Sequence, residues 1–161
     1  MIDQTHGNVR PVSRGPQALI CRTLVLAVVA ATGSASAASI VVSSDADNTN
    51  IDDSCTLREA IWNANDDAQI NVDCASGSGA DTIVFSFTGP SDRTITLTAA
   101  LPNVTNDSVL TIDGGSLGIT VSGDNQYRVF YLVNGSTLEL QHIRIEKGYG
   151  TGGGGAIISL G

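Results

Sequence analysis

Aromatic side chains and charged side chains are both scarce in this sequence, at 4% and 15% of residues. Such a composition does not favour a compact enzyme. Glycine is frequent instead, and short runs of Val, Ile, Leu and Thr alternate with Gly, Asn, Asp and Ser. Short apolar runs separated by turn residues predict an all-β protein with many turns.

Long apolar runs are missing too, since a helix that crosses a bilayer needs about 20 such residues. The apolar run at 24–31 is much shorter, follows three arginines and precedes the small residues 35–37. A basic start, an apolar core and small residues before the cut are the three parts of a secretory signal peptide. We predict that residues 1–37 are a signal peptide cut between Ala37 and Ala38, and that the mature chain has no transmembrane segment.

Basic residues become few once residues 1–37 are removed. Five remain against fifteen acidic residues, which gives a formal net charge of −10. Binding to a phosphate backbone requires a basic patch, so the charge balance excludes nucleic acid as a partner. It predicts a solvated acidic surface.

Two cysteines stay in the mature chain, Cys55 and Cys74, nineteen positions apart. In an exported protein a disulfide is the default state of such a pair. A redox or metal site would require a Cys-x-x-Cys pair or a nearby histidine, and neither is present. We predict a disulfide that stabilises the fold by about 3 kcal/mol through loop closure.

Residues 56–65 are the one convincing helix of the sequence. Thr56 and Glu59 form the Thr-x-x-Glu pattern of a capping box, in which the two side chains bond each other's backbone amides. An apolar stripe about two turns long follows, while Arg58, Asn63 and Asn65 lie off it; the stripe is Leu57, Ala60, Ile61 and Ala64. A helix this short is marginal alone, so its apolar face must pack on the rest of the chain.

The polar segment 43–53, before this helix, contains the aspartates Asp45, Asp47, Asp52 and Asp53. Carboxylate oxygens are ligands that Ca²⁺ prefers, but the glycine and terminal glutamate of an EF-hand loop are missing. Two interpretations stand: a calcium-binding loop, or a solvated connector whose last acids favour the positive end of the helix. We prefer the connector and assign no metal or cofactor.

Short strands fill the rest of the sequence, and we expect them at 39–42, 82–85, 94–97, 109–112, 119–121, 129–132, 137–140, 143–145 and 156–158. Two spacings indicate a repeat: Leu110 to Leu138 is 28 positions, and Val129 to Ala156 is 27. Short strands at such a period predict a right-handed parallel β-helix, built from stacked turns of three strands. A β-sandwich with turns every 8 to 12 residues is the alternative.

The segment Cys55-Thr56-Leu57-Arg58-Glu59-Ala60-Ile61 resembles the Cys-Ser-Leu-Arg-Glu-Ala signature of CSLREA-domain proteins, with threonine in place of serine. The resemblance continues through Cys74, residues 79–83 and residues 110–115, and covers roughly residues 39 to 161. It implies an exported bacterial protein, secreted or held at the cell surface or outer membrane. It also implies that the N-terminal module opens a right-handed parallel β-helix, and it implies no particular enzyme activity.

These observations divide the chain into the signal peptide, an N-terminal cap at 38–80 and β-helix rungs at 81–161. The helix would cover the apolar opening at the start of the coil, because uncovered strand edges invite aggregation. The C-terminal end has no such cover, so we expect further rungs beyond the given sequence.

No catalytic site is predicted. Parallel β-helices include pectate lyases and polygalacturonases, and the residues here that could serve such chemistry are Asp113, Asp124, Glu139, Glu146, Arg128, Arg144 and Lys147. They form no motif: Asp113 precedes two glycines as turn residues do, and Glu139 and Arg144 alternate with apolar neighbours as outward-facing residues do. No acidic or nucleophilic residue lies at a spacing from His142 that would indicate a catalytic pair. The glycines at 152–155 lack the lysine of a phosphate loop.

Two functions are compatible with this sequence. The one we prefer is a non-enzymatic secreted or cell-surface scaffold, adhesin-like, with an unknown surface ligand such as a carbohydrate. The alternative is a polysaccharide lyase or glycoside hydrolase of the pectate-lyase type, with its site beyond residue 161. Only the analogy of fold supports the alternative, and fold does not dictate function.

Overall fold

The computed structural model describes residues 36–105 and 109–160, which belong to one compact unit that spans Gly33–Gly161. The predicted signal peptide, residues 1–37, lies outside the described residues apart from Ser36 and Ala37. Among the described residues, no helix is long and apolar enough to cross a bilayer.

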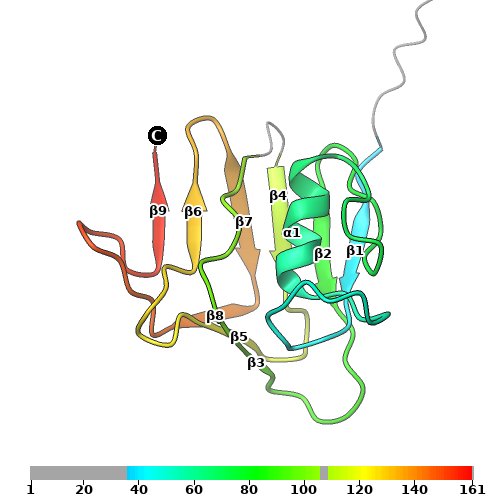
Figure 1. Ribbon diagram of the computed structural model, residues 1–161, viewed down its shortest axis with the longest axis horizontal. Coiled ribbons are helices and arrows are strands. Elements are labelled where there is room, and N and C mark those ends of the chain that lie inside the picture. Colours follow the sequence, from blue (N-terminus) through cyan, green and yellow to red (C-terminus); the bar gives the residue numbers. More distant parts are fainter. Residues whose placement is uncertain (1–35, 106–108, 161) are drawn as a thin grey trace, which may run out of the picture. The chain divides into compact units, whose positions relative to one another are not determined.

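The described residues form nine strands and one helix (Figure 1). Each predicted strand is present within one residue of its expected bounds, because each apolar run is ended by turn residues. In chain order the elements are β1 (Ser39–Val42), α1 (Leu57–Asn65), β2 (Thr82–Phe85), β3 (Thr94–Thr96), β4 (Val109–Asp113), β5 (Ile119–Ser122), β6 (Phe130–Leu132), β7 (Thr137–Gln141), β8 (Ile143–Glu146) and β9 (Ile157–Ser159).

The strands form three sheets, with the orders β1-β2-β4-β7, β3-β5-β8 and β6-β9. Every strand pair in these sheets is parallel. Parallel pairing confirms a mostly β fold with parallel sheets, and it contradicts the β-sandwich alternative, whose sheets are antiparallel.

The chain passes through the three sheets in a fixed order. β4, β5 and β6 lie one in each sheet, and β7, β8 and β9 repeat that order (Figure 1). β2 and β3 precede them, followed by Val104, which pairs with Leu132 of β6 in an isolated parallel bridge. The predicted spacing of 28 is the register of β4 on β7, where Leu110 faces Leu138. The spacing of 27 is the register of β6 on β9, where Phe130 faces Ile157.

Alternation along the strands places the apolar residues inside. In β2 and β4, for example, every second residue is buried, and the registered residues Ile83 and Ile112 both have no exposed surface. These side chains join Ile95 and Val121 of the second sheet in one continuous hydrophobic core. In β7 to β9, which lie at one edge of each sheet, no residue is fully buried. The opposite edge strand β1 does bury Ile40 and Val42, because α1 packs on it.

The helix α1 packs its predicted apolar stripe into this core and contacts β1 and β2. Leu57, Ala60, Ile61 and Ala64 are at most 1% exposed. The capping box is also confirmed: Glu59 Oε2 accepts the Thr56 amide at 3.0 Å, and Thr56 Oγ1 accepts the Glu59 amide at 3.3 Å.

The predicted disulfide joins Cys55 to Cys74 and ties the start of α1 to the connector that follows it. Asn63 fixes the same connector from within the helix. Its side chain donates to the carbonyls of Asn71 and Ala75, at 2.9 and 3.0 Å, and accepts the Asn71 amide at 2.7 Å. Gly77 must be a glycine here, because a Cβ would collide with the Asn63 carbonyl.

Candidate functional site

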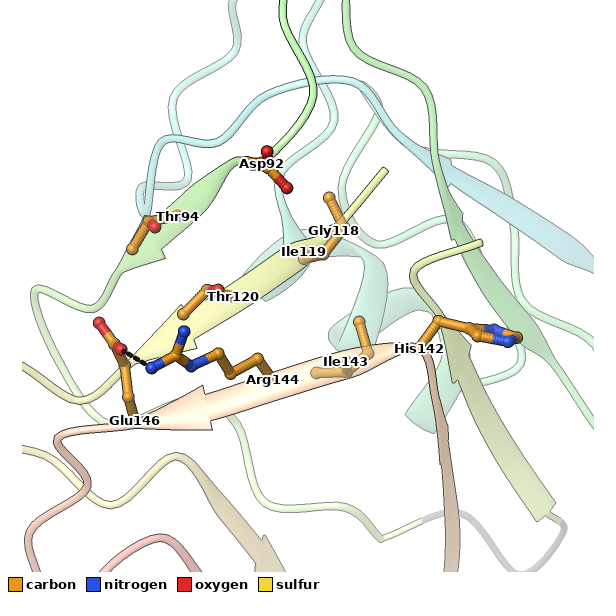
Figure 2. Close-up of a pocket in the computed structure, with 9 residues that line it drawn as sticks. All are labelled: Asp92, Thr94, Gly118, Ile119, Thr120, His142, Ile143, Arg144 and Glu146. Carbon is orange, nitrogen blue, oxygen red and sulfur yellow. Dashed lines mark ion pairs between the residues drawn. The ribbon is translucent and has the colours of Figure 1, made fainter. Parts of the chain in front are cut away.

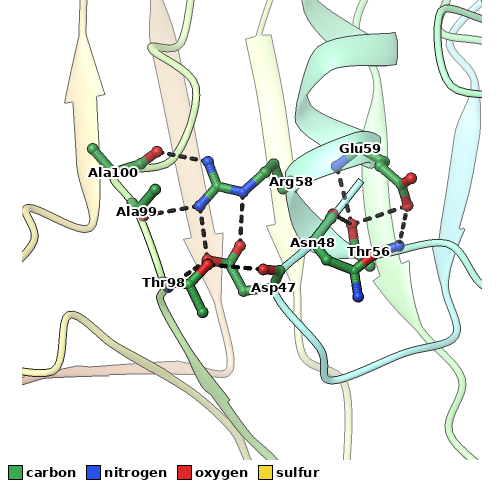
Figure 3. A network of polar contacts seen from close by, with 8 residues as sticks. All are labelled: Asp47, Asn48, Thr56, Arg58, Glu59, Thr98, Ala99 and Ala100. Atoms are coloured by element: carbon green, nitrogen blue, oxygen red, sulfur yellow. Dashed lines mark hydrogen bonds and ion pairs between the residues drawn. The ribbon is translucent and has the colours of Figure 1, made fainter. Parts of the chain in front are cut away.

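The first candidate region is a buried ion pair between the acidic segment and the helix (Figure 3). Arg58 Nε and Nη2 donate to the two carboxylate oxygens of Asp47, each at 2.8 Å. The two side chains are 9% and 1% exposed. Such a planar, two-point contact is the strongest geometry that an arginine and a carboxylate adopt.

The expectation that segment 43–53 is solvated is therefore wrong at Asp47. Arg58 lies off the apolar stripe of the helix, as predicted, but this ion pair buries it nevertheless. Burial opposes the charge of Asp47, but the hydrogen bonds from Arg58 and Thr98 outweigh it and hold the pKa of this carboxyl below its ordinary value. Asp45 pairs with Arg93 at 2.8 Å. No three acidic, histidine or cysteine side chains of the described residues gather into a metal site.

The helix also bonds to the backbone of the segment that follows β3. Arg58 donates to the carbonyls of Ala100 and Ala99, at 2.6 and 2.8 Å (Figure 3). Asn65 donates to the Asn103 carbonyl at 2.8 Å and accepts the Thr105 amide at 3.0 Å. Side chains of α1 thus satisfy backbone groups that a neighbouring strand would otherwise pair.

The second candidate region is a groove of about 620 Å³ on the sheet β3-β5-β8 (Figure 2). Polar side chains predominate among its lining residues, which are Asp92, Thr94, Gly118, Ile119, Thr120, His142, Ile143, Arg144 and Glu146. Thr94, Thr120 and Arg144 are in register across the three strands, so their side chains stack in one row. A row of this kind presents hydroxyls beside a guanidinium.

One end of the groove is a stacked corner. Asp92, Gly118 and His142 each lie two residues before the registered row, and each has a positive φ, of 62°, 66° and 53°. The left-handed conformation suits glycine best, and a Cβ at Gly118 would also collide with the Asp92 carboxylate. The corner therefore repeats in every pass through this sheet.

His142 has an acidic partner that the sequence analysis missed. Its Nδ1 lies 2.8 Å from Asp113 Oδ1, and Asp113 also accepts the Gly115 amide at 2.8 Å, as its predicted role in a turn requires. The hydrogen bonds from His142 and Gly115 hold the pKa of Asp113 below its ordinary value. His142 directly follows Gln141, the residue that faces Asp113 in the ladder at the predicted spacing of 28, and this spacing is the signal that could have revealed the pair.

The other candidate residues divide into two groups. Arg144 and Glu146 meet in the groove, with Nη2 and Oε2 3.4 Å apart and the arginine largely exposed. Asp124 contacts Gln126, and Arg128 donates to the carbonyls of Gly153 and Gly154 instead. Glu139 is exposed on β7, outside the groove, as alternation predicts.

The groove offers hydrogen-bond donors and acceptors side by side, from Arg144, Glu146 and two threonines. That mixture suits a ligand with many hydroxyl groups, each of which both donates and accepts. Comparison of the chain with models of protein families, with curated proteins and with solved structures gives no match.

Proposed function

We propose that this chain is a non-enzymatic module of an exported protein, secreted or held at a bacterial cell surface or outer membrane, and similar to CSLREA-domain proteins. Its architecture is a right-handed parallel β-helix that acts as an adhesin-like scaffold. The observation that carries the proposal is the fixed order in which the chain passes through three parallel sheets.

The handedness follows from a general rule. Two parallel strands of one sheet that are joined by a crossover follow a right-handed path in nearly all proteins. The connections from β2 to β4 and from β4 to β7, which leave the first sheet and return to it, are two such crossovers in succession. A coil of this kind exposes long outer sheet faces, which suits display and adhesion.

Two features support export. The basic start, apolar core and small residues of 1–37 form the signal pattern. The disulfide between Cys55 and Cys74 would persist in an oxidising compartment, whereas the cytosol of most bacteria keeps thiols reduced. Fractionation of cells that express the full chain, followed by surface digestion with protease, tests this part; retention in the cytosol would contradict it.

The ligand class we propose is a polysaccharide, bound in the groove on β3-β5-β8. The row of Thr94, Thr120 and Arg144 supplies the polar contacts. A glycan array identifies a ligand, and calorimetry then compares the wild type with Arg144→Met and with Glu139→Gln, a control outside the groove. We expect at least tenfold weaker binding for Arg144→Met alone; equal effects of both variants would contradict the site.

The second candidate function, a polysaccharide lyase or glycoside hydrolase, is favoured by one observation. His142, which lines the groove together with Arg144, forms a hydrogen-bonded pair with Asp113, and such pairs serve in proton transfer. Incubation with polygalacturonate and calcium tests it through the absorbance of unsaturated product. Product that disappears in His142→Gln would establish the enzyme and displace the scaffold.

A further inference from the structure

Ala38, the residue directly before β1, has a backbone nitrogen bonded to a side chain rather than to a strand. This nitrogen donates to Asp81 Oδ1 at 3.0 Å, while the Ala38 carbonyl accepts the Thr82 amide at 2.9 Å. Ser36 and Ala37, by contrast, are exposed. Ala38, the residue directly after the predicted cut, is thus held to residues 81 and 82 by both of its backbone groups.

Asp81 is a buried carboxylate without a counter-charge among the described residues. It has no exposed surface, and its other partner is the Ser78 amide, at 2.9 and 3.1 Å from its two oxygens. Burial raises the pKa of Asp81 above its ordinary value, and the charge of Asp67 adds to this, although the two amide hydrogen bonds oppose it. A cation at this carboxylate would relieve the cost of burial.

Removal of the signal peptide would create that cation at the right atom. Water adds across the Ala37–Ala38 peptide bond, so that Ala37 leaves as a carboxylate and Ala38 keeps an amine, which takes a proton. We propose that Asp81 is a binding site for the α-ammonium group of processed Ala38, and that the ion pair fixes β1 at the edge of its sheet. This inference rests on the proposed export.

The site would also select where the chain begins. Consecutive Cα atoms are about 3.8 Å apart, so an amine at residue 37 or 39 lies a full residue away from Asp81. An amine there cannot replace the Ala38 nitrogen in a contact of 3.0 Å. Only a chain that begins at Ala38 brings its α-ammonium group into contact with the buried Asp81 carboxylate.

The experiment compares two exported chains that differ only at the start. One begins at Ala38, and the other keeps Ser36 and Ala37 through a shifted cleavage site. The rate at which the α-amine is acylated, measured as a function of pH, gives the pKa of the amine in each of the two chains. We expect a pKa at least one unit above the ordinary 7.7 to 8.0 for the Ala38 start, which leaves roughly eightfold less neutral amine, or still less, to be acylated at pH 7. The Ser36 start should have an ordinary pKa.

Asp81→Asn in the Ala38 chain should return the amine to its ordinary pKa. The comparison of the two starts remains decisive even where this variant fails to fold, because neither start alters Asp81. Equal amine pKa values for the two starts would overturn the inference.

Identification of the first residue of the exported wild-type protein, together with the pKa of its amine, distinguishes failure of this inference from failure of the proposed function. Export with a start at Ala38 and a raised amine pKa supports both. Export with another start, or with an ordinary amine pKa, overturns the inference and leaves the function standing. An uncut chain retained in the cytosol overturns both.

Discussion

The charged carboxylate of Asp47 is almost completely buried, with 1% of the side chain exposed. Its carboxylate accepts two bonds from Arg58 and one from the Thr98 amide, at 2.6 Å. Breaking a buried ion pair at one partner leaves the other charge uncompensated, which typically costs about 3 to 5 kcal/mol. The cap therefore depends on one side chain from a polar segment.

Asp47→Asn should lower the free energy of unfolding by about 3 to 5 kcal/mol, because it leaves the Arg58 guanidinium without its counter-charge. Asp45→Asn is the matched control, since Asp45 pairs with Arg93 at 42% and 27% side-chain exposure, and we expect a loss of at most about 1 kcal/mol. Urea unfolding measures both. Equal losses would contradict the special role of the buried pair.

The same carboxylate should make stability depend on pH in the acid range. The pKa of Asp47 is lower in the folded chain than its ordinary 3.8, so the unfolded chain takes up this proton first. The stabilisation is complete above the ordinary value and is lost as the pH falls through the folded pKa. The difference in unfolding free energy between wild type and Asp47→Asn should therefore shrink below about pH 4. A constant difference from pH 6 to pH 2 would contradict this.

Polar residues were the part of the site that the sequence predicted least well. Hydrophobic periodicity places Arg58 and Asn63 off the apolar stripe, yet both are buried, at 8% and 0% exposure. Arg58 is buried by Asp47 and by the carbonyls at 99 and 100, and Asn63 by the backbone of the connector at 71 and 75, all of them partners outside the helix. A local pattern does not contain that information.

At the scale of elements, the capping box explains why α1 begins at one defined residue. Thr56 Oγ1 lies 3.0 Å from both the Glu59 carboxylate and the Asn48 carbonyl, so its hydroxyl joins the cap to the segment before it. A serine at this position would keep the hydroxyl. The serine variant therefore offers a conservative control.

Thr56→Ala should cost about 0.5 to 2 kcal/mol of stability, the usual range for the loss of an N-cap side chain. Thr56→Ser should cost less, because the hydroxyl that accepts the Glu59 amide remains. Thermal unfolding followed by circular dichroism compares the two. Similar losses would show that the methyl group, and not the hydroxyl, is what matters.

Reduction of the disulfide should lower stability by about 3 kcal/mol, as expected for a closed loop of this length. The bond joins residues 19 positions apart and ties the helix start to its connector. Unfolding with and without a reductant measures the loss, and the double variant Cys55→Ala, Cys74→Ala serves as the control that a reductant should not affect. A wild type insensitive to reduction would contradict the prediction.

The strands were predictable because each apolar run has its own turn residues at both ends, and the repeat was readable as a spacing. Leu110 and Leu138 lie opposite each other in the ladder, as their separation of 28 predicts. The corners were not predictable in the same way. Their left-handed residues include Asp92 and His142; these residue types favour that conformation more than most do, but the great majority of them adopt other conformations, so residue type alone does not locate a corner.

At the scale of the whole described unit, the strands stay paired in parallel although the number of residues between paired positions varies. Ser39 of β1 pairs with Thr82, 43 positions on, whereas Thr82 pairs with Thr111 after 29 and Thr120 pairs with Arg144 after 24. The long first interval contains α1 and the disulfide connector. The ladder therefore constrains the strands and tolerates different connections.

A ten-residue Gly/Ser peptide inserted between Asn134 and Gly135 should leave the unit folded. Both residues are exposed in the turn between β6 and β7, and a Cβ added at Gly135 would have no atom within 4 Å apart from its chain neighbours. The extra loop entropy is small, so we expect a melting temperature within a few degrees of wild type. The same peptide placed after Thr120, inside β5, should abolish cooperative melting; a folded product there would contradict the ladder.

This tolerance gives the molecule an unusual evolutionary freedom. Because hydrogen bonds between neighbouring strands fix the register, the loops at one corner can be lengthened, shortened or exchanged during evolution without a change in packing at the other corners. The longest of the intervals, between β1 and β2, is the one that contains the helix. Variation among natural relatives should accordingly gather at the corners, and foreign epitopes placed there would be presented in fixed order along the strands.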